Sequence, residues 1–177
     1  MGTSTKRNYL KFVNRLRKAL NHNAQISTLG HIKFATNKYP FQKVILGDHN
    51  PRRVLISAGI HGDEPAGVES VCAFLESGRY KAHLDEWEIT ILPCINPYGF
   101  ENDTRENHDH KDLNRLFKDQ LPPLEVQLAK STFKPSYFDI TIELHEDSDS
   151  HGYYLFQKSN QPRGLEVGFK IIEALKE

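Results

Sequence analysis

The sequence predicts an α/β fold with a central sheet, mostly parallel or mixed, that is flanked by helices. Apolar runs of strand length alternate with segments whose apolar residues recur at helical spacing, and this alternation is typical of α/β domains. The run from Val54 to Ala58 is continuously apolar, as expected for a strand that is covered on both faces. The length of 177 residues favours a single domain.

The first half of the chain is expected to hold two helices and several strands. The first helix is amphipathic and is predicted by apolar residues that recur at helical spacing among basic ones: Tyr9, Phe12, Val13, Leu16 and Leu20. Residues 25–47 predict short strands that are broken at Gly30 and Pro40. Pro65 suits the first turn of a second helix, which we expect to end near Gly78.

The second half is expected to continue the alternation of strands and helices. Between residues 96 and 111, Asn, Asp and His are too frequent for core packing, so this segment is predicted to be a polar loop. The regular elements are expected at residues 87–95 (strand), 123–131 (helix), 138–144 (strand), 153–156 (strand) and 164–176 (helix).

The composition is that of an ordinary globular protein with balanced charge. Lys and Arg total 23, as do Asp and Glu, so no overall field attracts nucleic acid or an anionic membrane. The chain shows neither a signal-peptide core nor a run approaching the roughly 18 apolar residues of a membrane span. Cys72 and Cys94 lie in apolar contexts that favour buried free thiols. We therefore expect a cytoplasmic protein without a nucleic-acid or membrane partner.

The strongest functional signal is a pair of histidine-bearing segments at the ends of two apolar runs. His61 and Glu64 follow the first run within one turn, and His145 ends the run that begins at Ile140. The carboxyl ends of parallel strands meet at one edge of a sheet, where α/β proteins bind ligands. Two histidines and one carboxylate form the ligand set of a catalytic zinc, whose fourth position stays open. We therefore predict one Zn²⁺ ion held by His61, Glu64 and His145.

The polar loop carries a second signal. It contains Arg105 and Arg115, with Asn114 beside the second arginine. Because a guanidinium presents a planar fork that suits a carboxylate, the loop is interpreted as an anion-recognition pocket. A solvated charged loop is the alternative interpretation.

Other residues also have ordinary structural interpretations. Glu64 can be an acid of the first helical turn, which the helix dipole favours. His108 and His110, on either side of Asp109, are expected to belong to a solvated loop rather than to a second metal site.

One ordered combination of motifs runs through the chain: His61-x-x-Glu64, Arg105, Asp112-Leu113-Asn114-Arg115 and His145. Over about residues 50–157, this combination resembles the M14-type zinc carboxypeptidases and the related succinylglutamate desuccinylase/aspartoacylase branch. The resemblance implies the family's α/β domain with a central mixed sheet, and it implies the same three zinc ligands.

The resemblance also implies roles for the loop residues. Arg105 would stabilise the oxyanion that forms when water attacks the carbonyl, and Asn114 and Arg115 would hold the substrate's free carboxylate. Asp112 would accept a hydrogen bond from the outer ring nitrogen of His61, a contact that fixes the tautomer of a metal ligand.

One part of the family pattern has no counterpart in this chain. The family uses a glutamate general base on a strand well after the third zinc ligand, whereas the glutamates here that follow His145 are Glu146, Glu166, Glu173 and Glu177. Glu146 adjoins a ligand and is expected to point away from the reacting water, and the others lie in or beside a helix-patterned segment. We therefore expect residues 1–177 to form a single, incomplete catalytic domain that lacks its C-terminal strands.

Three functions fit these observations. A metallocarboxypeptidase acting on a peptide C-terminus is favoured by the Asn96-Pro97-Tyr98-Gly99 segment before Arg105. A deacylase of N-acyl amino acids is favoured by Leu116-Phe117 directly after Arg115. A zinc-binding module without turnover is favoured by the missing base.

Overall fold

The computed structural model describes residues 6–20, 24–47, 49–133, 137–161 and 164–175. The chain divides into two compact units, Met1–Glu146 and Asp147–Glu177. The first unit contains the whole sheet and every predicted site residue.

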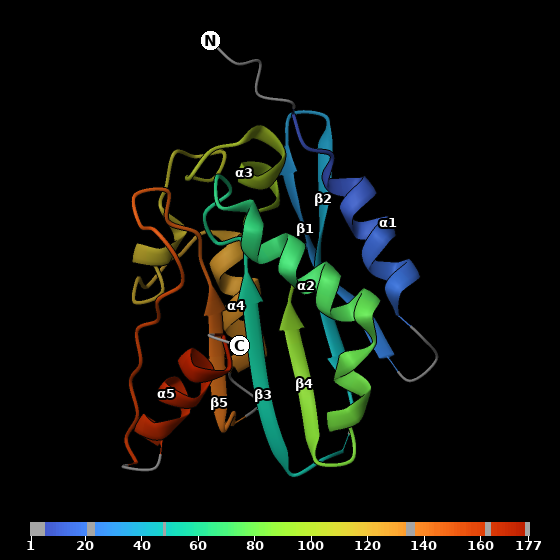
Figure 1. The fold of residues 1–177 in the computed structure, drawn as a ribbon. Helices are drawn as coiled ribbons and strands as arrows, with labels where there is room; N and C mark the ends of the chain where they lie inside the picture. The colour runs from blue at the N-terminus through green and yellow to red at the C-terminus, as the bar shows by residue number, and fades with distance from the viewer. Residues whose placement is uncertain (1–5, 21–23, 48, 134–136, 162–163, 176–177) are drawn as a thin grey trace. The chain divides into compact units, whose positions relative to one another are not determined.

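Among the described residues, the sheet of the first unit has five strands in the order β1-β2-β4-β3-β5. Its strands are β1 (Ala24–Phe34), β2 (Asn37–Leu46), β3 (Arg52–Ala58), β4 (Trp87–Leu92) and β5 (Ile140–Leu144). β3 pairs in parallel with β4 and β5, while β2 pairs antiparallel with β1 and β4. Figure 1 shows the arrowheads of β3, β4 and β5 at the same end of the sheet. The predicted mixed α/β sheet is confirmed.

The β1–β2 hairpin differs from the prediction of short, broken strands. Both strands are continuous, and the register shifts between Thr28 and Gly30, as in a β-bulge. Pro40 pairs with His31 within the hairpin, whereas β2 contacts β4 only from Val44 onward. The missing N–H of Pro40 therefore removes no bond to the rest of the sheet, which is why the strand tolerates it.

Helices cover both faces of this sheet (Figure 1). α1 (Tyr9–Ala19) and α2 (Pro65–Ser77) pack on one face, and α4 (Leu124–Phe133) packs on the other. The buried residues of α1 are Tyr9, Phe12, Val13 and Leu16, as the helical spacing predicts; Leu20, also predicted, follows the helix and is partly buried. Burying each such side chain contributes about 1.5–3 kcal/mol.

The described part of the first unit also contains three short helices: η1 (Arg79–His83), α3 (Pro97–Asn102) and η2 (Leu113–Arg115). α3 lies in a segment that we predicted to be a loop. The Asn96 side chain accepts a hydrogen bond from Gly99 N at 2.9 Å, and Pro97 fills the first turn. An asparagine cap followed by proline is sufficient to begin a helix even in a polar segment.

The second unit contains α5 (Leu165–Ala174). The strand predicted at residues 153–156 is wrong, because these residues adopt no regular structure. Tyr153, Tyr154 and Phe156 are exposed. An apolar run needs a neighbouring strand to form a ladder, and the described part of this unit contains none.

Both cysteine thiols are in the state that their apolar sequence contexts predict. Cys72 and Cys94 are free and buried, as predicted. Burial raises the pKa of the Cys72 thiol to about 11 and also raises that of Cys94.

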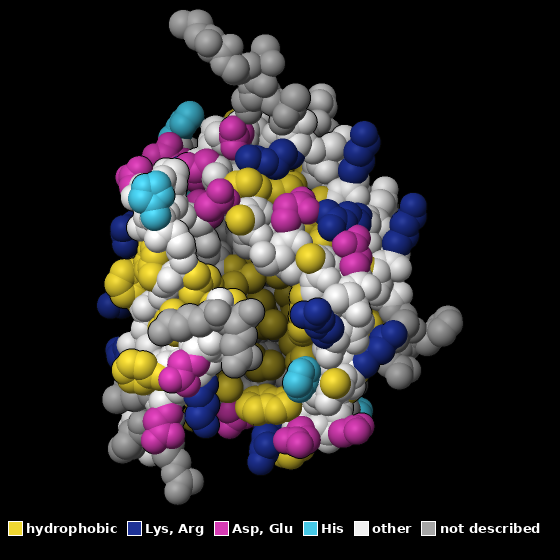
Figure 2. Space-filling model, viewed as in Figure 1, with side chains coloured by type: hydrophobic (Ala, Val, Ile, Leu, Met, Phe, Trp, Pro, Cys, Tyr) yellow, Lys and Arg dark blue, Asp and Glu magenta, His cyan; other side chains and the backbone are white. Residues whose placement is uncertain are grey.

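Lys and Arg are interspersed with Asp and Glu over the face formed by α1 and α2 (Figure 2). Within the described residues, no helix has both the length and the apolar character needed to cross a membrane.

Candidate metal centre

The loop after β3 carries two of the predicted ligands. Pairing between the ends of β3 and β4 continues past the strands, because Ile95 N donates to Ala58 O at 3.0 Å and Asn96 N donates to Gly59 O at 2.8 Å. Gly59 has a φ of +62°, and a Cβ there would lie 2.6 Å from Val68 Cγ2. A side chain at this position would be both strained and obstructed, so glycine allows the chain to turn toward His61.

A second glycine brings the same loop against α3. A Cβ on Gly62 would lie 1.9 Å from the carbonyl carbon of Gly99. The backbone between His61 and Glu64 therefore rests directly on the helix that precedes Arg105.

The three predicted ligands meet at this point. Glu64 lies between two imidazoles, with Oε1 2.7 Å from His61 Nδ1 and Oε2 2.8 Å from His145 Nδ1. One ligand atom from each residue lies within 4.8 Å of the other two. The His61 ring is buried, whereas the His145 side chain is 36% exposed. Glu64 stands at the start of α2 but does not cap it, so its carboxylate is directed to the histidines.

Electrostatics keep the Glu64 carboxylate ionised. Burial alone would raise its pKa, but hydrogen bonds from His145 and from the backbone N–H of Glu146, together with the charge of His61, lower the pKa below its usual value. An ionised carboxylate is the form that ligates a metal.

The donor set fits a transition-metal ion. Ligand atoms around a tetrahedral zinc lie about 3.4 Å apart, given metal–ligand distances near 2.1 Å. The three ligand atoms here lie within 4.8 Å of one another, so a modest inward movement of the side chains would bring them to a shared ion. Two imidazole nitrogens suit zinc and its neighbours, whereas calcium and magnesium take oxygen ligands. We conclude that the side chains of His61, Glu64 and His145 can hold one such ion.

Asp112 and Arg105 form a second layer around the ligands. Asp112 Oδ1 lies 3.2 Å from His61 Nε2, on the side of the ring opposite Glu64. Arg105 donates from Nη1 to Glu64 Oε1 and from Nη2 to Asp112 Oδ2, both at 3.3 Å. Burial would raise the pKa of Asp112, but His61, Arg105 and the backbone N–H of Asn114 lower it.

The loop residues are fixed through their backbone. Asn96 Nδ2 donates to Arg105 O at 3.3 Å, and Asn114 N donates to Asp112 Oδ1 at 3.0 Å. Arg115 is the last residue of η2, and its backbone N donates to Asp112 O at 3.1 Å. Its side chain is 74% exposed, and its Nε lies 4.0 Å from Asp112 Oδ2. The structure therefore brings Arg105 and Asp112 to the ligands and leaves the Arg115 guanidinium open to solvent.

The prediction of a solvated loop is wrong for His108. Its ring packs against Phe34 and Tyr98, with centroids 5.4 and 5.9 Å away. Its Nδ1 faces the buried Glu125 carboxylate at 3.7 Å, and Asn107 Nδ2 donates to Glu125 at 3.3 Å. These contacts secure the loop to α4. The sequence gives no signal for this contact, because Glu125 has the pattern of an ordinary acid in the first turn of a helix.

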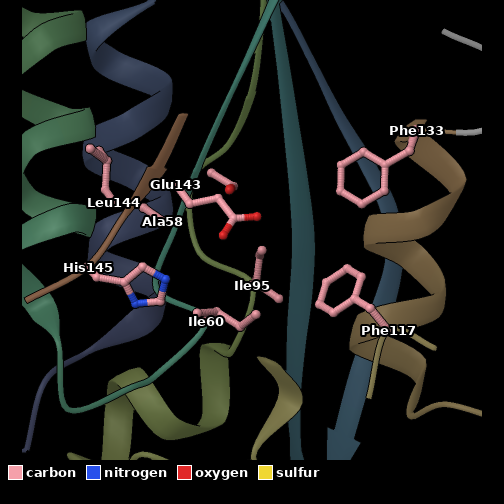
Figure 3. A pocket seen from close by; sticks show the side chains of 9 residues that line it. Ala58, Ile60, Ile95, Phe117, Phe133, Glu143, Leu144 and His145 are labelled. Atoms are coloured by element: carbon pink, nitrogen blue, oxygen red, sulfur yellow. The ribbon is translucent and has the colours of Figure 1, made fainter. Parts of the chain in front are cut away.

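Two glutamates next to His145 have different surroundings. Glu146 Oε2 accepts a hydrogen bond from Ala66 N at 2.9 Å, so Glu146 caps α2 as Glu64 does not. Glu143 lies two residues before His145 and projects toward a pocket that His145 also lines (Figure 3). The pocket is lined by Ser57, Ala58, Ile60, Ile95, Phe117, Phe133, Glu143, Leu144 and His145. Glu143 was not among the residues predicted for the site, although strand alternation places it on the same side as His145.

The chain is similar in sequence to known carboxypeptidases. Carboxypeptidase SOL1 of Arabidopsis thaliana is 29% identical over 119 residues, covering 59% of this chain and 24% of the relative. Carboxypeptidase M of Mus musculus is 32% identical over 111 residues, covering 50% of this chain and 25% of the relative. The chain thus spans about a quarter of the length of these curated relatives.

The fold and the family are shown independently of those relatives. A metallo-carboxypeptidase from Burkholderia cenocepacia has the same fold, with a TM-score of 0.69 at 20% identity over 81% of this chain and 42% of that chain. Residues 50–177 match the model of the succinylglutamate desuccinylase/aspartoacylase catalytic domain, which confirms the resemblance seen in the sequence. The chain therefore belongs to the succinylglutamate desuccinylase/aspartoacylase family within the M14-type zinc carboxypeptidase superfamily.

Proposed function

We propose that this chain carries the metal-binding and carboxylate-binding parts of a zinc hydrolase that cleaves an amide bond next to a free carboxylate, and that the activity is that of a metallocarboxypeptidase. The observation that carries this proposal is the convergence of His61, Glu64 and His145 within 4.8 Å. The carboxypeptidase relatives support the peptidase activity. The free, buried Cys72 and Cys94 support a reducing compartment such as the cytoplasm.

The chain's own residues supply orientation and charge. His61, Glu64 and His145 would hold zinc, which polarises a carbonyl and activates water for attack. The Arg105 guanidinium, held beside Glu64 and Asp112, would stabilise the negative charge that develops on the carbonyl oxygen. Arg115, whose side chain is largely exposed, would pair with the substrate carboxylate together with Asn114. Asp112 would fix the tautomer of His61 by accepting from its Nε2.

The second candidate is a deacylase of N-acyl amino acids. It is favoured by the family match over residues 50–177, because that family is described as a desuccinylase and aspartoacylase catalytic domain. Both activities break an amide bond beside a carboxylate, so the side chains of the site suit either substrate.

A substrate comparison separates the two activities. The zinc-loaded protein is assayed on hippuryl amino acids and on N-acetyl and N-succinyl amino acids. The proposal predicts that kcat/KM is higher for the hippuryl substrates. A clear preference for the N-acyl amino acids would replace the peptidase with the deacylase.

The third candidate, a zinc-binding module without turnover, is favoured by the missing family base and by the surroundings of Glu146. Glu146 is engaged at the start of α2, so it is not oriented as a proton acceptor at the metal. Loss of a general base typically costs 10²–10⁴-fold in rate, so we expect the 177-residue chain to bind zinc and turn over weakly. Turnover at ordinary enzyme rates would contradict this expectation.

A further inference from the structure

Arg7, in the N-terminal segment, contacts both the loop after β3 that carries His61 and Glu64 (the metal-binding loop) and the helix α3. Arg7 Nη1 donates to Gly62 O at 3.1 Å and to Phe100 O at 3.2 Å, and Arg7 Nη2 donates to Asp103 Oδ1 at 2.7 Å. We propose that Arg7 is a positioning residue for the metal site. This inference rests on the proposed metal binding by His61, Glu64 and His145.

The acceptors of Arg7 lie in two segments that both belong to the site. Gly62 lies between the two ligands His61 and Glu64, and its backbone rests on Gly99 of α3. Asp103 directly follows α3 and precedes Arg105 by two residues. One guanidinium therefore joins the loop that carries two ligands to the segment that carries Arg105.

The surroundings hold Arg7 in place. Its guanidinium carbon lies 5.5 Å from the centre of the Phe100 ring. On the same helix, Glu101 accepts from Tyr9 N and from Tyr39 OH, both at 3.1 Å. The N-terminal segment is thus docked on α3 through both Arg7 and Tyr9, and the Arg7 side chain is 26% exposed.

The geometry requires an arginine rather than any cation. Two carbonyl oxygens and one carboxylate accept from two nitrogens of a single planar group. A lysine offers one nitrogen on a flexible stem and cannot reproduce this fork. Arg7 also lies outside the residues that match the family, 50–177, so this support comes from a part of the chain that the family match does not include.

Loss of the guanidinium would leave the Gly62 carbonyl without this donor and would loosen the loop between two ligands. Changing an outer partner of a metal ligand typically lowers metal affinity by 10–100-fold. We expect Arg7→Met to weaken zinc binding by about tenfold, at the lower end of that range, because Arg7 acts on the backbone rather than on a ligand ring.

The test measures the Kd for zinc by competition with a chromophoric chelator, and it also measures thermal unfolding of the metal-free protein. The variants are Arg7→Met, Arg7→Lys and the control Arg15→Met. Arg15 joins α1 to Glu69 and Glu76 of α2, so its loss also weakens the docking of α1 without touching the metal-binding loop. Arg7→Lys keeps the charge and decides the matter if Arg7→Met does not unfold cooperatively.

The expected result is a tenfold weaker Kd for Arg7→Met, a smaller loss for Arg7→Lys and a parental Kd for Arg15→Met. A parental Kd for both Arg7 variants would overturn the inference while leaving the metal site intact. An equal loss in Arg15→Met would also overturn it, because Arg7 would then act only through docking of α1. If the parent chain itself does not bind zinc, the proposed function fails and this inference fails with it.

Discussion

The two histidines of the site stand at the ends of two parallel strands, but their surroundings differ. The side chain of His61, after the central β3, is 4% exposed, whereas that of His145, after β5, is 36% exposed. His61 has a carboxylate at each ring nitrogen, Glu64 at Nδ1 and Asp112 at Nε2. The His61 side of the site is therefore part of the core, and the His145 side is open to solvent.

The difference follows from the order of the strands. β3 lies between β4 and β5, while β5 is at the edge of the described sheet. A ligand after a central strand is held by neighbours on both sides, and a ligand after an edge strand is held on one. The buried half is therefore preformed, whereas the exposed half depends on the metal and on Glu64 for its position.

The largest expected effect separates the two histidines. Both His61→Gln and His145→Gln should weaken zinc binding by more than the roughly 10–100-fold typical of an outer partner. His61→Gln should also destabilise the metal-free fold by about 1–3 kcal/mol, because it removes two hydrogen bonds of a buried ring, whereas His145→Gln should stay within about 0.5 kcal/mol. Zinc titration and urea unfolding measure these effects. Equal destabilisation by both variants would contradict the comparison.

A second prediction concerns Arg105, which faces the ligands from an exposed loop. Arg105→Ala should lower any measurable kcat by about 10²–10³-fold, as for loss of an oxyanion donor. Zinc affinity should also fall, by about tenfold, because Arg105 donates to the Glu64 carboxylate. Kinetics on the preferred substrate, with zinc bound at saturation, check this. A loss that appears only in zinc affinity would assign Arg105 to the metal site instead of to the reaction.

A third, smaller effect is expected for Asp112 on the buried side. Asp112→Asn should weaken zinc binding by about 10–100-fold, because the amide can no longer accept from His61 Nε2 with a full charge. Competition with a chelator measures the change. A zinc affinity equal to that of the parent would show that Asp112 does not control the His61 ring.

The smallest predicted effect is on the cap of α2. Glu146→Ala removes the acceptor of Ala66 N and should destabilise the fold by about 1 kcal/mol, as for other helix caps. The control Glu143→Ala, from the same strand end, should stay within about 0.5 kcal/mol. Urea unfolding at fixed pH compares the two variants, and equal values would contradict the capping role.

The sequence predicts some of these features better than others. The meeting of His61, Glu64 and His145 follows from apolar runs that end in ligand residues, since parallel strands bring their carboxyl ends together. The β1–β2 hairpin differs from the predicted broken strands, because Pro40 interrupts a strand only where the sheet needs its N–H. Arg7 and Glu125 act through contacts between segments far apart in the chain, and local spacing cannot indicate such contacts.

The central claim is that one metal ion shares His61, Glu64 and His145. X-ray absorption spectroscopy of the chain loaded with one equivalent of zinc tests it most directly, because the only cysteines, Cys72 and Cys94, are buried and free. We predict nitrogen and oxygen ligands at about 2.0–2.2 Å, with the scattering pattern of two imidazoles that is lost in His61→Gln. A zinc–sulfur distance of about 2.3 Å, or a spectrum that His61→Gln leaves unchanged, would contradict the claim.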